Sequence, residues 1–161
     1  MELFHSSPKQ FDKFDLSKIG DTTGVNKYGF GLYFSDSYDD VVKHAYQNTL
    51  PKQNIFIYTV KVFNSDYIVE YEEQVKSLFP FFSKLKEDEI EDLERLQDEY
   101  GLSYRELHEY LESIYGAKET SSIFTKCHIT GFKISTSGYY DTVYVIFSPD
   151  DLKILDVEQL Q

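Results

Sequence analysis

Two short stretches of the sequence combine residue types that could bind a ligand. Near the N-terminus, His5 closes an apolar stretch and is followed by two serines. Further along, the segment 26–37, NKYGFGLYFSDS, sets Gly29 and Gly31 among aromatic and aliphatic residues and then becomes polar. Because a glycine lets another group approach the backbone closely, this spacing indicates that something comes close to the chain here.

Other kinds of site fit the sequence poorly. The GFG pair lacks the third glycine of a dinucleotide fingerprint, since position 34 is Phe34, and no phosphate-binding P-loop or G-x-S-x-G serine motif is present. The acidic run KEDEIEDLE does not have the spacing of a calcium loop. Metal ligands should cluster, but the histidines are scattered, so we expect no metal; they are His5, His44, His108 and His128. His108 is predicted to lie on the exposed side of a helix and to be inert.

The charge is strongly negative and unevenly distributed. The net charge is −12 over 161 residues, and the segment 70–99 holds eleven acidic and four basic residues. We expect a solvated helical face there, which would repel nucleic acid phosphates. The chain has no apolar run long enough to span a membrane, and we do not expect its N-terminal residues to act as a secretory signal. Its single cysteine, Cys127, fits a reducing compartment and is predicted to be a packed, structural thiol.

The hydrophobic pattern predicts strands at both ends of the chain and helices between them. Strands are expected at 2–5, 31–34, 54–63, 131–136, 142–147 and 152–157, with a long loop at 8–27. Helices are expected at 38–48 after an N-cap at Asp36 or Ser37, at 66–79, 82–99 and 118–127, and after the capping box of Ser103 and Glu106. The sequence therefore predicts one α+β domain over 1–161, with a mainly helical insert over 66–127.

The order of these segments resembles a known family. LFHSSPKQFDKFDLSKIG, YGFGLYFSDSYDDVVKHAY and IYTVKV resemble the opening of the diphtheria-toxin and PARP-like ADP-ribosyltransferases, and they are most similar to the PolyVal type of phages and mobile elements. YRELHEYLESIYGAKETSSIFTKCHITGFKI resembles the helical pair and the following strand of that group, and YVIFSPDDLKIL resembles its closing segment. The resemblance implies split antiparallel β-sheets with a helical insert, and NAD as a substrate.

The resemblance also assigns roles to individual residues. His5 would hydrogen-bond the adenosine ribose, the backbone at Ser6, with Ser7 beside it, would face the nicotinamide amide, and Tyr33 would stack on the nicotinamide ring. A ring from the next helix would form the other wall of the pocket, Tyr46 in preference to His44. Gly29 and Gly31 would let the ligand approach the backbone. Aromatic faces suit a flat heterocycle, and a cationic nicotinamide adds a cation–π attraction.

The sequence departs from the family pattern on a late strand. Many relatives carry a glutamate where this chain has Val143, and the PolyVal type often has asparagine there. Asp141 would share a strand face with Val143, because side chains alternate along a strand, so it is the candidate catalytic carboxylate. Tyr139 and Tyr140 would face the acceptor substrate.

The function expected from these residues is mono-ADP-ribosyl transfer from NAD to an unknown macromolecule, with release of nicotinamide. A protein acceptor is expected before a nucleic acid, and no membrane is involved; the location would be the bacterial cytoplasm if a phage or mobile element encodes the chain. The alternative is a catalytically degraded NAD-binding or protein-interaction module of the same fold. An acidic protein that mimics nucleic acid ranks last, because it rests on charge alone.

Overall fold

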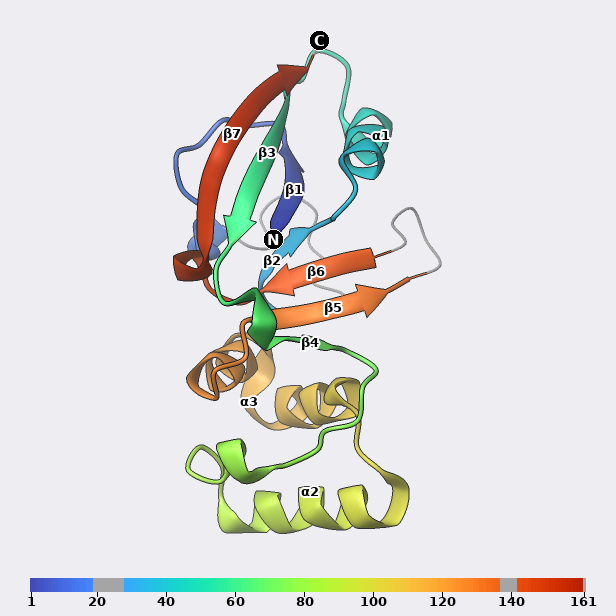
Figure 1. Ribbon diagram of the computed structural model, residues 1–161, viewed down its shortest axis with the longest axis vertical. Coiled ribbons are helices and arrows are strands. Elements are labelled where there is room, and N and C mark those ends of the chain that lie inside the picture. The colour runs from blue at the N-terminus through green and yellow to red at the C-terminus, as the bar shows by residue number, and fades with distance from the viewer. Residues whose placement is uncertain (19–27, 137–141, 161) are drawn as a thin grey trace.

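The computed structural model describes residues 1–18, 28–136 and 142–160, and within them the chain forms two β-sheets and three α-helices (Figure 1). One sheet has the strand order β1-β3-β7 and is antiparallel: β1 (Glu2–Ser7), β3 (Ile55–Val62) and β7 (Leu152–Leu160). The other has the order β2-β6-β5-β4, and only β4 and β5 are parallel: β2 (Leu32–Phe34), β6 (Thr142–Ile146), β5 (Gly131–Ser135) and β4 (Ile68–Glu70). The expected α+β class is confirmed.

The two sheets meet where β1 passes the end of β2. The backbone N–H of Phe4 donates to the carbonyl of Ser35 at 2.8 Å, and that of Ser35 donates back at 3.0 Å. A shared apolar core lies between the sheets, and it includes Leu3, Leu32, Phe34, Tyr58 and Ile146. Strand β1 therefore belongs to the three-stranded sheet and is also bonded to the end of β2 in the four-stranded sheet.

Helix α1 (Tyr38–Asn48) covers the three-stranded sheet and forms where the sequence predicts it. Ser37 is the N-cap, and its side chain accepts a hydrogen bond from the N–H of Asp40 at 3.2 Å. Val41 and Ala45 pack against Ile57 and neighbouring apolar side chains. The helix thus buries the face of the sheet that points away from the shared core.

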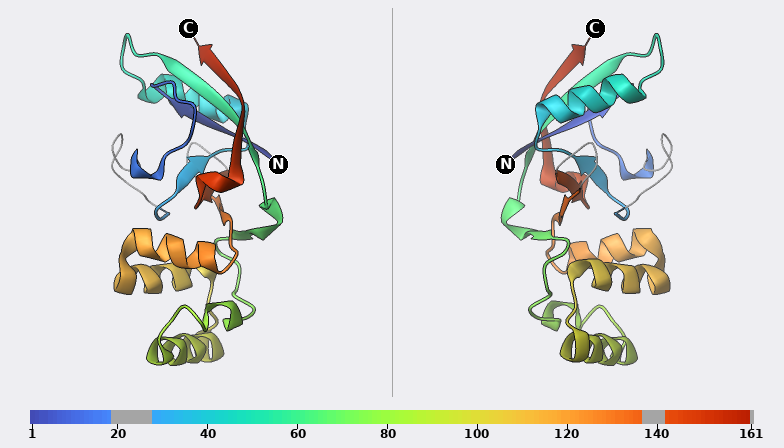
Figure 2. Two further views of the ribbon diagram at one scale, coloured as in Figure 1. Left: turned by 90° about the vertical axis from the view of Figure 1, so that its left-hand side faces the viewer. Right: turned by 90° about the vertical axis from the view of Figure 1, so that its right-hand side faces the viewer.

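Two further helices lie beyond the four-stranded sheet, with α3 between the sheet and α2 (Figure 2). α2 spans Glu87–Tyr100 and α3 spans Tyr104–Lys126. The predicted capping box is present, since the side chain of Ser103 accepts from the N–H of Glu106 and the Glu106 carboxylate accepts from the N–H of Ser103. Gly116, at φ +80°, interrupts α3 with a kink. The two helices predicted before and after this residue therefore form the two halves of α3.

The prediction of a helix at 66–79 is wrong. Ser65–Tyr67 forms a 3₁₀ turn, Ile68–Glu70 forms β4, and the chain then continues without regular structure to Leu78. Its backbone groups bond to other elements instead, as when the N–H of Tyr71 donates to Lys133 and that of Val75 to Leu102. Bonds to β5 and to the segment before α3 satisfy these groups, so the helical spacing of the side chains does not decide the structure.

Cys127 ends α3 and is buried, as the sequence predicts. Its thiol donates to the carbonyl oxygen of Pro80 at 3.3 Å. Burial raises the pKa of this thiol, and the charge of Lys84 opposes the change only in part.

We therefore expect a thiol reagent to modify Cys127 slowly in the native protein and rapidly in denaturant, because the reactive thiolate is disfavoured and covered. The rate of modification under the two conditions measures this directly. Equal rates would show that the thiol is accessible in the folded chain.

Candidate functional site

His5 connects the two sheets through its imidazole. Its Nδ1 lies 2.8 Å from the carbonyl oxygen of Tyr33, and since a carbonyl can only accept, Nδ1 carries the hydrogen. The ring packs between aromatic neighbours, with centroids 5.4 Å from Phe14 and 5.6 Å from Phe34. Burial lowers the pKa of His5, opposed by the bond to Tyr33, so the ring is neutral near pH 7 and Nε2 is an acceptor.

Tyr33 points the opposite way from His5. Its neighbours Leu32 and Phe34 belong to the core between the sheets, whereas the Tyr33 ring packs on the helix side of the four-stranded sheet. Its hydroxyl donates to the carbonyl oxygen of Gly29 and accepts from the N–H of Tyr28, both at 2.8 Å. The structure thus brings His5 to the backbone of Tyr33, while the two rings lie on opposite faces of β2.

The groups that come close to Gly29 and Gly31 belong to the chain itself. Gly29 has φ +99°, and a Cβ there would lie 2.5 Å from Nε2 of His108. A Cβ on Gly31 would lie 2.6 Å from Cγ1 of Val145 on β6. Contacts inside the fold therefore require both glycines, and their role toward NAD stays a prediction.

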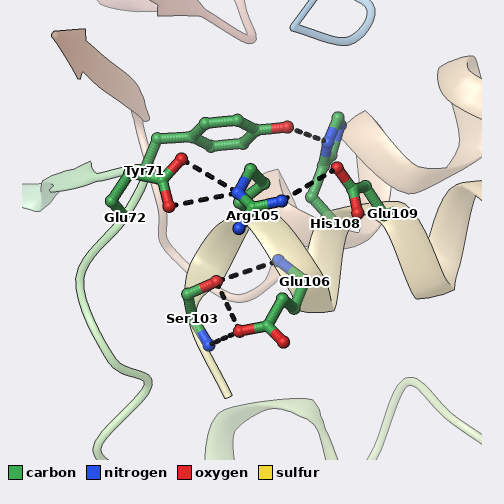
Figure 3. Close-up of polar contacts among 7 residues, drawn as sticks. All are labelled: Tyr71, Glu72, Ser103, Arg105, Glu106, His108 and Glu109. Atoms are coloured by element: carbon green, nitrogen blue, oxygen red, sulfur yellow. Dashed lines mark hydrogen bonds and ion pairs between the residues drawn. The ribbon is translucent and has the colours of Figure 1, made fainter. Parts of the chain in front are cut away.

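His108 is not an exposed, inert residue, and that prediction is wrong. Its side chain is 4% exposed, and Nδ1 lies 2.9 Å from the Tyr71 hydroxyl (Figure 3). In the sequence, helical spacing predicts an apolar stripe of Leu107, Tyr110, Leu111 and Ile114. The four-stranded sheet packs on the side of α3 that carries Leu107, His108 and Leu111, while Ile114 is 46% exposed. The buried face is therefore rotated relative to the stripe seen in the sequence.

Glu112 follows His108 by one helical turn and faces it. The distance between Nε2 of His108 and Oε1 of Glu112 is 2.6 Å, so the two side chains are in close polar contact. Within the described residues, Oε1 is buried and has no hydrogen-bond partner, although 30% of the side chain is exposed. Sequence reasoning missed this pair, and its spacing of four residues on a helix is the signal that could have found it.

The protonation states of this pair follow from its surroundings. Burial lowers the pKa of His108 to about 4, so the imidazole is neutral near pH 7. Burial also raises the pKa of Glu112, and the charge of Glu109 adds to this effect. Burial raises the pKa of Tyr33 as well, with the charge of Glu112 contributing, so its hydroxyl stays protonated.

A surface network holds the segment that carries Tyr71 against α3. Arg105 lies 2.9 Å from a carboxylate oxygen of Glu72 and 3.6 Å from one of Glu109 (Figure 3). Its backbone N–H also donates to the carbonyl of Tyr71 at 2.8 Å. Exposed ion pairs such as these are individually weak, so the backbone bond and the packing of Tyr71 fix its hydroxyl on His108.

The other predicted site residues are spread over the fold. Ser6 and Ser7 pair with Ile57 and Phe56 on β3. Tyr46 lies on α1, over the other sheet from Tyr33, and is 52% exposed.

The candidates on the late strand are only partly described. Val143 is half-buried in the helix-side core, with Ile134 as its partner on β5. Tyr139, Tyr140 and Asp141 lie outside the described residues, so their roles stay predictions.

Searches with protein-family models, against curated proteins and against solved structures find no match to this chain. Among the described residues, no three His, Cys, Asp or Glu side chains gather as metal ligands. No helix in this part of the chain is long and apolar enough to cross a membrane.

Proposed function

We propose that the protein transfers ADP-ribose from NAD to a macromolecular acceptor and releases nicotinamide. The observation that carries the proposal is the bond from His5 to Tyr33, at the point where β1 of one sheet meets β2 of the other. It joins the two residues that the sequence motif singles out, and it leaves Nε2 of His5 as an acceptor for a hydroxyl. The split sheets with a helical insert support the same assignment.

The chemistry asked of the site is the cleavage of an N-glycosidic bond. The bond from ribose C1′ to the nicotinamide nitrogen breaks, and positive charge develops on the sugar. His5 would hold a ribose hydroxyl and the Tyr33 ring would face the nicotinamide. The acceptor is proposed to be a protein, since the acidic face of α2 would repel nucleic acid.

NAD binding tests the proposal, and we expect Tyr33→Ala to weaken it by about 5- to 150-fold. Stacking of a base on an aromatic ring contributes about 1–3 kcal/mol, which corresponds to that range. Calorimetry on the wild type, on Tyr33→Ala and on Tyr100→Ala measures the effect. Tyr100 is 81% exposed at the end of α2, so its replacement is the control.

Two results would count against the proposal in different ways. No binding of NAD to the wild type would remove NAD as the substrate. Equal affinity in the wild type and Tyr33→Ala would remove the stacking role while leaving the substrate in place.

A second candidate is a binding module of the same fold that does not transfer ADP-ribose. Val143, an apolar side chain packed in the helix-side core, favours this candidate because it cannot bond a ribose hydroxyl. Incubation with labelled NAD and a cell extract separates the two functions. Labelled macromolecules require transfer, whereas tight NAD binding without any labelled product favours the module.

A further inference from the structure

We propose that Glu112 is the carboxylate that acts on the ribose of NAD, and that His108 positions it. This inference rests on the proposed function and adds a catalytic residue to it. Glu112 comes from α3, which packs over the four-stranded sheet on the same side as Tyr33 and Val143. The anionic group is thus supplied by the helix rather than by strand β6.

The carboxylate lies beside the turn that holds Tyr33. A Cβ built on Gly29 would be 3.2 Å from Oε1 of Glu112, and the carbonyl of Gly29 accepts from the Tyr33 hydroxyl. The charge of Glu112 also contributes to the raised pKa of the Tyr33 hydroxyl. Glu112 therefore lies beside the turn to which the Tyr33 hydroxyl is bonded.

Oε1 of Glu112 is buried and has no hydrogen-bond partner among the described residues, which is unusual for a purely structural carboxylate. A buried oxygen without a hydrogen-bond partner costs free energy, about 1–3 kcal/mol and more when it is charged. Structural glutamates elsewhere in the described chain are satisfied, as Glu106 is by Ser103. Oε1 itself is covered, so a substrate would meet the exposed part of the Glu112 side chain, which amounts to 30% of its surface.

His108 lies in close contact with this oxygen and limits where it can move. Nε2 lies 2.6 Å from Oε1, and Nδ1 is bonded to Tyr71, which the neighbouring segment holds in place. Phe124 and Phe132 pack against the ring and leave it little freedom to turn. A carboxylate held in one orientation needs little rearrangement when positive charge develops near it.

The reaction balances with these groups alone. The bond from C1′ to the nicotinamide nitrogen breaks, and its electron pair leaves with nicotinamide while Glu112 stabilises the cationic sugar. An oxygen or nitrogen of the acceptor forms the new bond to C1′ and loses its proton to Glu112. The proton then passes to solvent, and the carboxylate is restored.

The test is the Glu112→Gln variant, which keeps the shape of the side chain and removes the charge. We expect its rate of transfer from labelled NAD to fall by about 10²–10⁴-fold, the usual loss of a general base. NAD affinity by calorimetry should change by less than about threefold, since the neutral amide still fits. Glu119→Gln, the same change at an exposed position of α3, is the matched control and should keep full activity.

Two more variants separate a catalytic role from a structural one. Glu112→Asp keeps the charge but withdraws it, so it should retain more activity than Glu112→Gln. His108→Gln should lower kcat while leaving KM nearly unchanged, because it releases the carboxylate without touching NAD. A purely structural role for His108 would instead lower thermal stability and leave kcat per folded molecule intact.

The outcomes distinguish this inference from the function on which it rests. An active wild type with a fully active Glu112→Gln overturns the role of Glu112 alone, as does loss of activity in Asp141→Asn but not in Glu112→Gln. A wild type that binds no NAD overturns the proposed function and the role of Glu112 together.

Discussion

Gly29→Ala is expected to destabilise the protein by about 2–6 kcal/mol, through two separable effects. The first is conformational, because φ is +99° at Gly29 and side chains rarely adopt such a backbone, at a cost of about 1–3 kcal/mol. The second is steric, because the new Cβ would lie 2.5 Å from Nε2 and 2.7 Å from Cε1 of the buried His108. Overpacking of this kind costs a further 1–3 kcal/mol or so.

A control variant in the same chain isolates the steric part. Gly116 has φ +80°, yet a Cβ there would meet nothing within 4 Å among the described residues. Gly116→Ala should therefore show only the conformational cost. Chemical denaturation of both variants gives the two free energies of unfolding, and their difference estimates the cost of the contact with His108.

A double-mutant cycle tests the identity of that contact. Replacing His108 with alanine removes the atoms that the new Cβ would meet, so Gly29→Ala should cost less in that background. Coupling energies between contacting residues are about 0.5–3 kcal/mol. If the two changes were additive, the cost at Gly29 would not come from His108, and the packing of this turn on α3 would be wrong.

The parts of the fold that the sequence predicts are those decided by local chemistry. Helix α1 begins after Ser37 because the hydroxyl caps it, and α3 begins after Ser103 because Glu106 completes the box. Strand β3 follows from a nearly continuous run of apolar and β-branched residues. In each case, neighbours within a few positions supply the determining interactions.

The parts that the sequence does not predict depend on distant contacts. Residues 68–70 form a strand because β5 offers a free edge to them, although their side chains have helical spacing. The buried face of α3 is set by the sheet, and this moves His108 from the predicted surface into the core.

The candidate site likewise has one part that the local sequence predicts and one part that depends on distant contacts. The motif points to His5 and Tyr33, and the hydrogen bond between them is a local consequence of how β1 meets β2. The pairing of Glu112 with the Tyr33 turn requires α3 to lie over the four-stranded sheet. Since α3 is about 80 residues further along the chain, no pattern near the motif could have indicated it.

The burial of His108 predicts a loss of stability in mild acid. Its pKa is lowered to about 4 in the folded chain, against about 6.5 when unfolded. Below pH 6.5 the unfolded chain takes up a proton that the folded chain does not, so the contribution present at pH 7 is lost as the pH falls toward 4. The full effect is about 3 kcal/mol. Glu112 acts in the opposite direction, because its raised pKa favours folding as the carboxyl becomes protonated.

The free energy of unfolding should therefore fall between pH 7 and pH 4.5 in the wild type and fall less in His108→Gln, whose side chain does not titrate. Burial lowers the pKa of His5 as well, so the free energy of unfolding should fall with falling pH in both proteins. Only the difference between the two curves measures the contribution of His108. The same series in a Glu112→Gln background removes the opposing carboxyl and should steepen the slope assigned to His108. Parallel curves for the wild type and His108→Gln would mean that folding does not lower the pKa of His108, so that the imidazole takes up its proton equally readily in the folded and the unfolded chain. Glu112 would then face a cation in mild acid, in place of the neutral imidazole that the proposed arrangement assumes.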